Sequence, residues 1–262
     1  MIKALFTAAT GMKGQQTNVD VISNNIANVN TNGFKRSRVN FEDLLYLRLG
    51  TAGDAANGVA PPTAFEVGSG VRAVSTTRTF TPGSLEGTQR ELDVAISGDG
   101  FFQVQLPDGT IAYTRDGAFH TDSQLNLVTA EGYLVDPSIT IPADTQNISI
   151  SPEGVVAVVT AGDTSTIQVV GQLQLTRFAN PAGLSAHGSN LFLETPSSGA
   201  PTQSTPGQNG AGTLVQGYLE RSNVDVVTEL VNLIVAQRAY EVNSRAIRTG
   251  DEMLSQVNGL IR

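Results

Sequence analysis

Residues 225–247 read DVVTELVNLIVAQRAYEVNSRAI, and this stretch decides the fold of the chain. Its apolar residues recur every three or four positions, and the same spacing continues to Leu254. Such a period places apolar side chains along one face of an α-helix. We therefore predict a helix over about 225–260, capped by Ser222 or Asn223. At about 1.5 Å per residue, this helix would be roughly 50 Å long.

The first thirty residues repeat the pattern in a weaker form. A heptad-like stripe is carried by Leu5, Met12, Val19 and Ile26. Two glycines within it, Gly11 and Gly14, each weaken an isolated helix by about 1 kcal/mol relative to Ala. The chain is thus predicted to begin and end with a long helix whose apolar stripe needs a partner.

Between the two helices the period changes to that of β-structure. PDGT at 107–110 has the composition of a hairpin turn, and 194–213 is a loop by its Gly, Pro, Ser and Thr content. Short apolar or alternating runs predict strands at 92–96, 101–106, 111–115, 155–159, 167–170 and 173–178.

These patterns predict an α+β fold. Residues 1–32 and 225–262 would form a terminal helical assembly domain, packed as a coiled-coil-like inner layer. Residues 33–70 would be an extended connecting segment, and residues 71–224 a β-rich outer domain. Helices of this length cannot bury their stripes in the β body, so the two ends are expected to pack together or against copies of themselves.

Polar residues interrupt both stripes, among them Gln16, Gln237 and Ser244. They suit an isolated two-helix coil poorly, but they find partners in crowded multi-helix packing. The alternative is an ordinary intramolecular helix pair that caps a β domain, and the pattern leaves both interpretations open.

Composition excludes several classes of site. The 262 residues suit one large domain or two modest ones. The absence of Cys excludes disulfides and thiolate sites. The net charge is −8, and residues 50–224 carry sixteen acids against six Arg, which is the wrong sign for nucleic acid. The apolar run at 4–9 is short and interrupted, so we expect the N-terminus to belong to the mature protein.

The sequence carries no pattern that indicates catalysis. His120 and His187 lie far apart in loop-like contexts, and no nucleotide-binding or hydrolase motif occurs. Paired carboxylates such as Asp108 and Asp116 stand in Asp-Gly turns, where Asp is expected for backbone reasons. We expect no enzyme, no cofactor and no metal.

The run NNIANVNTNGFKR at 24–36 is rich in amides. Asn24, Asn25 and Asn28 lie at helical spacing, so in a close-packed assembly their amides could bond to adjacent helices. We expect Gly33 to take a positive φ that ends the helix.

Two basic residues follow this glycine. Lys35 and Arg36 are well placed for the dipole at the C-terminal end of the first helix.

Two long motifs at opposite ends resemble the bacterial flagellar rod and hook family. SNNIAN at 23–28 followed by TNGFK at 31–35 resembles its N-terminal signature, and 216–247 resembles its C-terminal signature. SGDGFFQV at 97–104 and AYTRDGAF at 112–119 resemble its outer domain. The resemblance covers nearly the whole chain.

The resemblance implies a structural subunit that is exported unfolded by the flagellar type III route and polymerises into a hollow tube transmitting motor torque. The length of the chain and residues 41–50 are most similar to subunits of the distal rod, with a proximal rod or hook-type protein as the alternative. Residues 47–67 could then stiffen contacts between copies. The implied location is the flagellar basal body, from the periplasm to the outer membrane. The implied partners are further copies of the chain, proximal rod proteins, the hook protein, the peptidoglycan-layer and outer-membrane ring proteins, the export apparatus and the rod cap.

The residues expected to carry subunit assembly come from both ends of the chain: Leu5, Met12, Val19, Asn24, Asn25, Ile26, Asn28, Gly33, Phe34, Leu230, Leu233, Gln237, Tyr240, Ile247 and Leu254. A secreted β-rich binding protein or adhesin is the alternative from a different class. It would explain the acidic body but leave the paired terminal stripes without a use.

Overall fold

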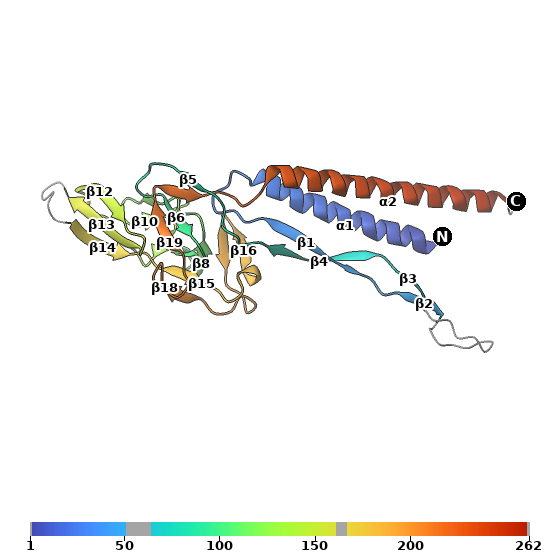
Figure 1. Cartoon of the computed structure of the whole chain (residues 1–262), viewed down its shortest axis with the longest axis horizontal. Helices are drawn as coiled ribbons and strands as arrows, with labels where there is room; N and C mark the ends of the chain where they lie inside the picture. Colours follow the sequence, from blue (N-terminus) through green and yellow to red (C-terminus); the bar gives the residue numbers. More distant parts are fainter. Residues whose placement is uncertain (1, 51–63, 161–166, 261–262) are drawn as a thin grey trace. The chain divides into compact units, whose positions relative to one another are not determined.

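The computed structural model describes residues 2–50, 64–160 and 167–260. They form two compact units. The helical unit comprises the described residues of 1–27, 37–78 and 225–262, and the β unit those of 28–36 and 79–224. Two long terminal helices and a β-rich centre make the fold α+β, as predicted (Figure 1).

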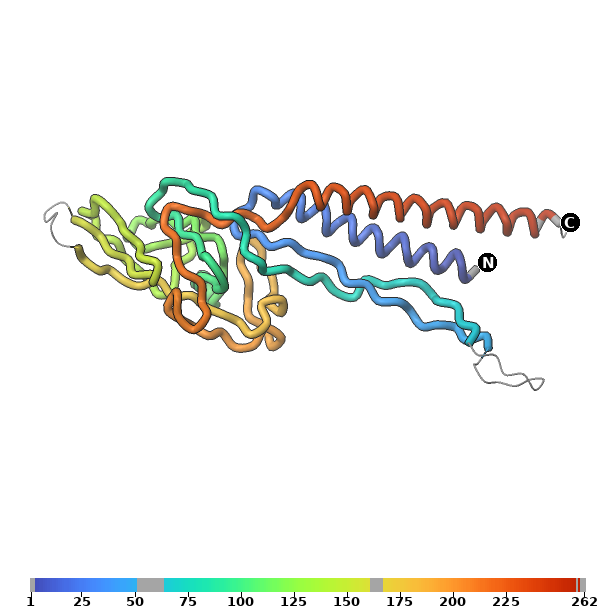
Figure 2. The backbone as a smooth tube through the Cα atoms, in the orientation of Figure 1, coloured from blue at the N-terminus to red at the C-terminus, as the bar shows by residue number. Residues whose placement is uncertain are grey.

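The helical unit is built on an antiparallel pair, α1 (Ile2–Ala27) and α2 (Val226–Leu260), which lie side by side in Figure 2. Two glycines set how closely they approach. A Cβ on Gly250 would lie 2.6 Å from Leu5 Cδ2, and a Cβ on Gly11 would lie 2.9 Å from Asn243 Nδ2. The glycines that weaken each helix in isolation therefore allow the two backbones to come together.

A long two-stranded ribbon completes the helical unit. β1 (Ser37–Asp43) pairs with β4 (Val71–Arg78), and β2 (Leu47–Gly50) pairs with β3 (Phe65–Val67), both antiparallel. The ribbon packs along α1, since a Cβ on Gly14 would lie 3.2 Å from the Phe41 ring and the Lys3 ammonium donates to the Val67 carbonyl at 2.9 Å. Much of the predicted connecting segment is thus paired strand. Its residues 51–63 lie outside the described part of the chain.

The β unit consists of several antiparallel sheets. Its seven-stranded sheet has the order β16-β17-β8-β7-β11-β10-β9, and a three-stranded sheet has the order β12-β13-β14. The remaining pairs are β15 with β18, β19 with β6, and β20 with β5.

The strands of the β unit are short. Their bounds are β5 Leu85–Gly87, β6 Val94–Ser97, β7 Phe102–Gln105, β8 Ile111–Thr114, β9 His120–Thr121, β10 Leu127–Val128, β11 Leu134–Asp136, β12 Thr145–Ile150, β13 Val155–Thr160, β14 Ile167–Gln172, β15 Leu175–Arg177, β16 Ser185–Gly188, β17 Leu191–Leu193, β18 Thr202–Ser204, β19 Thr213–Gln216 and β20 Tyr218–Glu220. A 3₁₀ turn, η1, spans Pro181–Gly183.

The predicted hairpin is present. β7 and β8 pair in antiparallel register, and the Leu106 N–H donates to the Thr110 carbonyl at 2.9 Å. Gly109 in the turn has a φ of +82°, which glycine adopts without strain.

One prediction was wrong in the centre of the chain. Residues 194–213 were expected to be loop throughout, but β18 pairs with β15 inside this stretch. Its residues are polar, so no alternation marks the strand; the Gln203 amide instead donates to Gln103 Oε1 at 2.8 Å.

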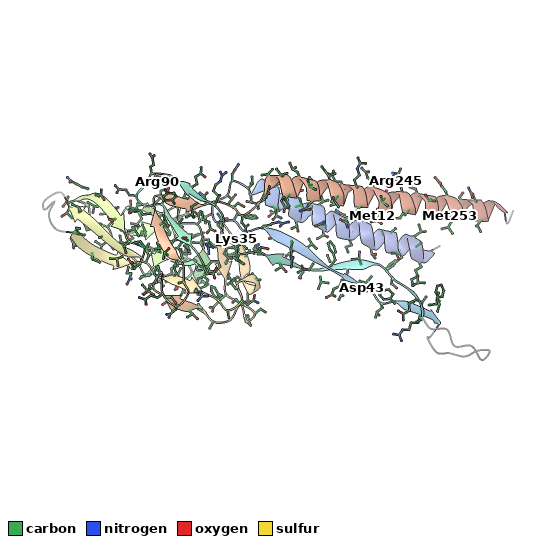
Figure 3. The ribbon with its side chains drawn as sticks, viewed as in Figure 1. Met12, Lys35, Asp43, Arg90, Arg245 and Met253 are labelled. Carbon is green, nitrogen blue, oxygen red and sulfur yellow. The ribbon has the colours of Figure 1, made fainter. Side chains whose placement is uncertain are left out.

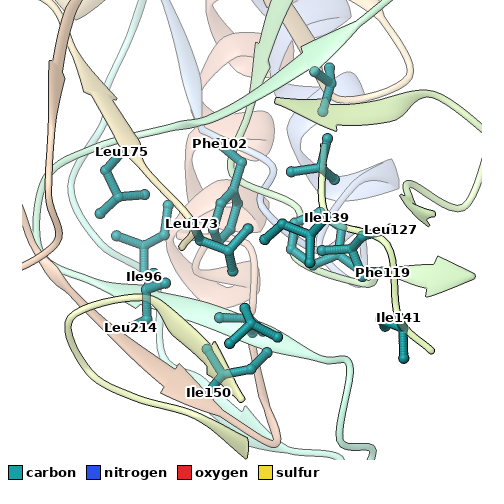
Figure 4. Packing of buried hydrophobic residues seen from close by; sticks show 14 of the residues in the cluster. Ile96, Phe102, Phe119, Leu127, Ile139, Ile141, Ile150, Leu173, Leu175 and Leu214 are labelled. Atoms are coloured by element: carbon teal, nitrogen blue, oxygen red, sulfur yellow. The ribbon is translucent and has the colours of Figure 1, made fainter. Parts of the chain in front are cut away.

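The β unit has a large apolar core (Figure 4). Side chains of Ile96, Phe102, Leu127 and Ile139 meet at its centre, each at most 2% exposed. A second cluster joins five aromatic rings with edge-to-face contacts, drawn from Phe80, Phe101, Tyr113, Phe178 and Phe192. Because each fully buried large apolar side chain stabilises the fold by about 1.5–3 kcal/mol, this unit holds itself together.

Candidate assembly site

The outer face of α2 exposes a row of large apolar side chains. Val227 is 70% exposed, Ile234 57% and Val235 63%, and Leu230 and Val231 lie between them. Positions separated by three, four or seven residues share one helix face, so the row forms a continuous stripe over more than two turns. An apolar face of this kind is typical of a surface that is covered by another molecule.

The predicted apolar stripe of α2 is partly half-buried and partly exposed to solvent. Leu233, Ile247 and Leu254 are half-buried, whereas Leu230 and Tyr240 are exposed. A helix has 3.6 residues per turn, so a stripe counted at 3.5 drifts around its surface.

Among the α2 residues whose side chains the structure describes, the buried ones were not in the predicted set. They are Ala236, Gly250 and Glu229, two of them small enough for close helix packing. The half-buried residues of α1 include Leu5, Met12, Val19 and Ile26.

An open groove between α1 and α2 brings predicted residues of both ends together. It is lined by Gln16 and Val19 from α1 and by Gln237, Tyr240 and Glu241 from α2. The groove mixes apolar carbons with amide and carboxylate groups, so a side chain entering it could pack and hydrogen-bond at once.

Asn25 is buried and bonds within its own chain. Its Nδ2 donates to the Ser37 carbonyl at 2.8 Å and to Glu229 Oε2 at 3.2 Å, and its Oδ1 accepts from the Ser37 N–H at 3.0 Å. This differs from the expected bond to a neighbouring helix. The amide instead ties the end of α1 to the start of the ribbon and to the first turn of α2.

The other amides of the signature lie in mixed surroundings. Asn24 is exposed and Asn28 is half-buried, and Asn28 Oδ1 accepts from the Thr31 hydroxyl at 3.1 Å. Phe34 is half-buried.

Gly33 has a φ of +68°, which confirms the predicted positive value. It does not end the helix, however, because α1 already stops at Ala27. The glycine serves close packing within the β unit: a Cβ would lie 2.8 Å from the Asp116 nitrogen. Its N–H donates to the Glu220 carbonyl at 2.8 Å.

A buried ion cluster lies beside this glycine. Glu220 Oε1 accepts from the Lys35 ammonium at 2.6 Å, and Oε2 accepts from Arg115 Nε at 2.7 Å. All three side chains are at most 2% exposed. Figure 3 labels Lys35 among the crowded side chains. The cluster joins residues of both terminal signatures to Arg115, directly after β8.

Backbone groups complete the cluster. Lys35 donates to the Thr81 carbonyl at 2.8 Å, and Arg115 donates to the Gly100 and Gly98 carbonyls at 2.9 Å each. Burial lowers the pKa of Lys35, the neighbouring Arg115 lowers it further, and the Glu220 carboxylate opposes both.

The expected role of Lys35 at a helix dipole is therefore wrong, because the side chain turns into the β unit. Sequence reasoning missed the cluster altogether. The signal it left is a charged residue directly at the end of an apolar strand, as in Tyr113-Thr114-Arg115 and Tyr218-Leu219-Glu220.

The cap of α2 also differs from the prediction. Asp225 Oδ1 accepts from the Val227 N–H at 2.9 Å and from the Thr228 N–H at 3.4 Å, so Asp225 is the capping residue. The bonds from Thr228 and Val227 lower the pKa of its carboxyl. Asn223, expected as a cap, instead accepts from the Arg36 N–H at 2.8 Å.

Residues 2–50, 64–160 and 167–260 contain neither a metal-binding cluster nor a membrane-spanning helix. No three His, Cys, Asp or Glu side chains there gather as a metal ion would need. No helix in these ranges has the length and apolar content to cross a membrane.

Three family descriptions match the chain. Residues 5–35 match the flagella basal body rod protein family, 95–158 the D1 domain of flagellar hook proteins FlgE/F/G, and 215–260 the C-terminal region of flagellar basal body rod FlgEFG proteins. These ranges contain the helix ends, the hairpin and the ion cluster described above.

Several full-length relatives carry the same name. A flagellar basal-body rod protein FlgG of Buchnera aphidicola subsp. Acyrthosiphon pisum is 51% identical over 99% of this chain and 100% of its own. Proteins of the same name from Borreliella burgdorferi and Bacillus subtilis are 50% and 41% identical, over 100% of both chains in each comparison.

Proposed function

The chain belongs to the flagellar basal-body rod and hook family as a structural subunit of the distal rod, and we propose that it polymerises there into a hollow helical drive shaft. It resides in the flagellar basal body. In the proposed shaft, α1 and α2 of many copies pack side by side, coiled-coil-like, as an inner layer. The β units form the outer wall, and the tube transmits motor torque to the hook across the periplasm and outer membrane.

The observation that carries this proposal is the exposed apolar face of α2. Val227, Ile234 and Val235 remain more than half exposed in the single chain. Burying such side chains against neighbouring copies is favourable by about 25 cal/mol for each Å² of apolar surface removed from water. Burial of this exposed face of α2 between copies would therefore supply much of the free energy of assembly.

The proposed assembly residues fall into two groups according to their exposure. Leu230, Gln237 and Tyr240 are exposed and would contact neighbouring copies directly. The half-buried residues would hold the α1–α2 pair in the shape that a neighbour recognises: Leu5, Met12, Val19, Ile26, Leu233, Ile247 and Leu254. Asn24, Asn28 and Phe34 retain enough exposure to be reached by a second copy, and Asn25 and Gly33 would act by shaping the chain beside them.

The ribbon supports a further part of the proposal. Leu45 is 89% exposed and Phe65 65% exposed, on either side of the stretch outside the described residues. We propose that residues 47–67 form a stiffening contact between copies, and that proximal rod proteins, the hook protein, the ring proteins, the rod cap and the export apparatus are the partners of the shaft.

The test is a charge placed on the outer face of α2. Ile234→Asp should abolish rod assembly and motility, because a carboxylate would be buried without a partner between copies. The thermal unfolding of the β unit, followed by circular dichroism, should not change, since Ile234 lies outside it.

Ile234→Val is the matched control and should assemble. Rods of normal length containing Ile234→Asp, seen by electron microscopy of isolated basal bodies, would disprove the proposed inner layer.

A further inference from the structure

The three-stranded sheet of the β unit has one covered edge and one open edge. On the β12 side, Gln216 accepts from the Ile150 N–H at 3.0 Å and donates to the Ile148 carbonyl at 2.7 Å. Glu91 accepts from the Ile148 N–H at 3.1 Å. On the other side, β14 pairs only with β13 among the described strands.

The open edge carries an exposed apolar patch. Ile167 is 73% exposed and Val169 63% exposed, the highest values among the large hydrophobic residues of the described β unit. Their cross-strand partners on β13 are Val159 and Ala157. Because directly opposed residues share a face, these four residues form one surface, here called the β14 patch.

The opposite face of β13 lies in the core. Val156 is 2% exposed and Val158 is fully buried. A strand with apolar side chains on both faces, as in VVAVVT at 155–160, is typical of one that is covered on both sides. In the single chain one face is buried and the other, with Ala157 and Val159, is half-buried.

Charge and proline, two usual protections of an edge strand, are missing from β14, although its pairing with β13 contains a bulge between Val156 and Ala157. Natural edges carry Lys, Pro or inward charges that prevent pairing with another chain. β14 reads IQVVGQ, with no charge and no Pro, and the strands β12 and β13 also carry no charged residue. Apart from this sheet, the β unit is acidic, with fourteen acids against six basic residues.

The size of the patch limits what could bind it. A six-residue strand is about 20 Å long. One row of side chains along it covers on the order of a few hundred Å², whereas stable complexes bury about 1,200–2,000 Å². The patch is therefore too small to hold a freely diffusing protein, and it suits a neighbour that other contacts already keep in place.

We propose that the β14 patch is an accessory contact for the β unit of a second copy of this chain, made only between copies held together by their terminal helices. The inference rests on the proposed polymer. Two strongly acidic units repel each other, so their closest contact should lie where neither carries charge.

The test uses the absence of Cys in the natural chain, which makes an introduced thiol unique. Val169→Cys would be labelled with a benzophenone maleimide and irradiated within isolated basal bodies. We expect a product of twice the mass of the chain from assembled rods and none from dilute monomer. Thr110→Cys, in an exposed turn beside Asp108, is the control and should give no such product.

Each other result would overturn the inference. A cross-linked product that contains a different protein would show that the β14 patch does not contact a second copy of this chain. Rods that contain the labelled chain but give no product would leave the proposed function standing and remove the β14 patch from it. Basal bodies that lack the natural chain would refute the proposed function itself.

A second measurement does not depend on the label. Val169→Glu should leave the melting temperature of the monomer unchanged, because the side chain is exposed, but should shorten or weaken isolated rods. Ile111→Glu is the matched control: Ile111 is 41% exposed on β8, which has a neighbouring strand on each side. Equal rod lengths for natural chain and Val169→Glu would contradict the proposal.

Discussion

The two units of this chain bury their side chains very differently. In the described helical unit, only Ala8, Ile22 and Ala236 are buried apolar residues, whereas the main core of the β unit contains nineteen. Large apolar side chains stay exposed along α2 and along the ribbon. One unit thus completes its own core, and the other leaves apolar surface that further copies would cover in the proposed polymer. In that proposal, stability and assembly depend on separate parts of the sequence.

The largest expected effect is the loss of the terminal helices α1 and α2 to protease. In dilute monomer, α1 and α2 should open readily because few of their residues are buried. Limited proteolysis with mass spectrometry should leave a fragment that retains both Lys35 and Glu220, since these lie in the β unit. If the two ends resist digestion, the helix pair is stable by itself and the contrast between the units fails.

Next in size is the removal of the buried carboxylate. Glu220→Gln leaves Lys35 and Arg115 as buried cations without a counter-charge, which should cost about 3–5 kcal/mol of β-unit stability in urea unfolding. Glu86→Gln is the control. Its exposed pair with Arg221 should contribute at most about 1 kcal/mol. Similar losses for the two variants would mean that the ion cluster does not stabilise the unit.

Two glycine substitutions compare the units directly. Gly33→Ala should destabilise the β unit by about 1–3 kcal/mol, because its φ is positive and backbone atoms occupy the Cβ position. Gly11→Ala should change stability by less than about 1 kcal/mol, since the gain in helix propensity offsets a shift of the flexible Asn243 side chain. Urea unfolding measures the first and helical circular dichroism the second. A larger loss of stability for Gly11→Ala than for Gly33→Ala would mean that the helical unit, and not the β unit, is the more tightly packed one.

The smallest expected effect appears only at high pH. Burial, together with the nearby carboxylates of Glu194 and Asp136, raises the pKa of Tyr113 to about 12. An unfolded tyrosine ionises near pH 10, so the stabilisation is complete below about pH 10 and is lost as the pH rises towards 12. Tyr113→Phe should flatten this alkaline loss in thermal unfolding, while the exposed Tyr218→Phe should not. An unchanged slope for Tyr113→Phe would exclude this residue as its source.

Sequence patterns identified the elements that depend on local periodicity. The 3–4 spacing gave both helices, and PDGT gave the β7–β8 hairpin. Sequence patterns failed to predict contacts between residues that are far apart in the chain. Lys35 and Glu220 are 185 residues apart in sequence, so no local window links them.

The ends of elements also depend on tertiary contacts. Asp225 caps α2 because Asn223 is already engaged with the Arg36 backbone. The assembly role of the residues chosen from the sequence stays a prediction, and Asn28, Gly33 and Phe34 lie beyond the end of α1 at Ala27. Which face meets the partner helix was set by Ala236, Gly250 and Gly11, small residues that a search for large apolar side chains overlooks.

The ion cluster also bears on the order in which the β unit can fold. A chain that emerges from its N-terminus presents Lys35 first and Arg115 next, while their shared carboxylate is residue 220 of 262. Until that residue arrives, closing the β unit would bury two positive charges against each other. Early closure is thereby penalised, and we expect the β unit of a chain arriving from its N-terminus to close only once Glu220 is present.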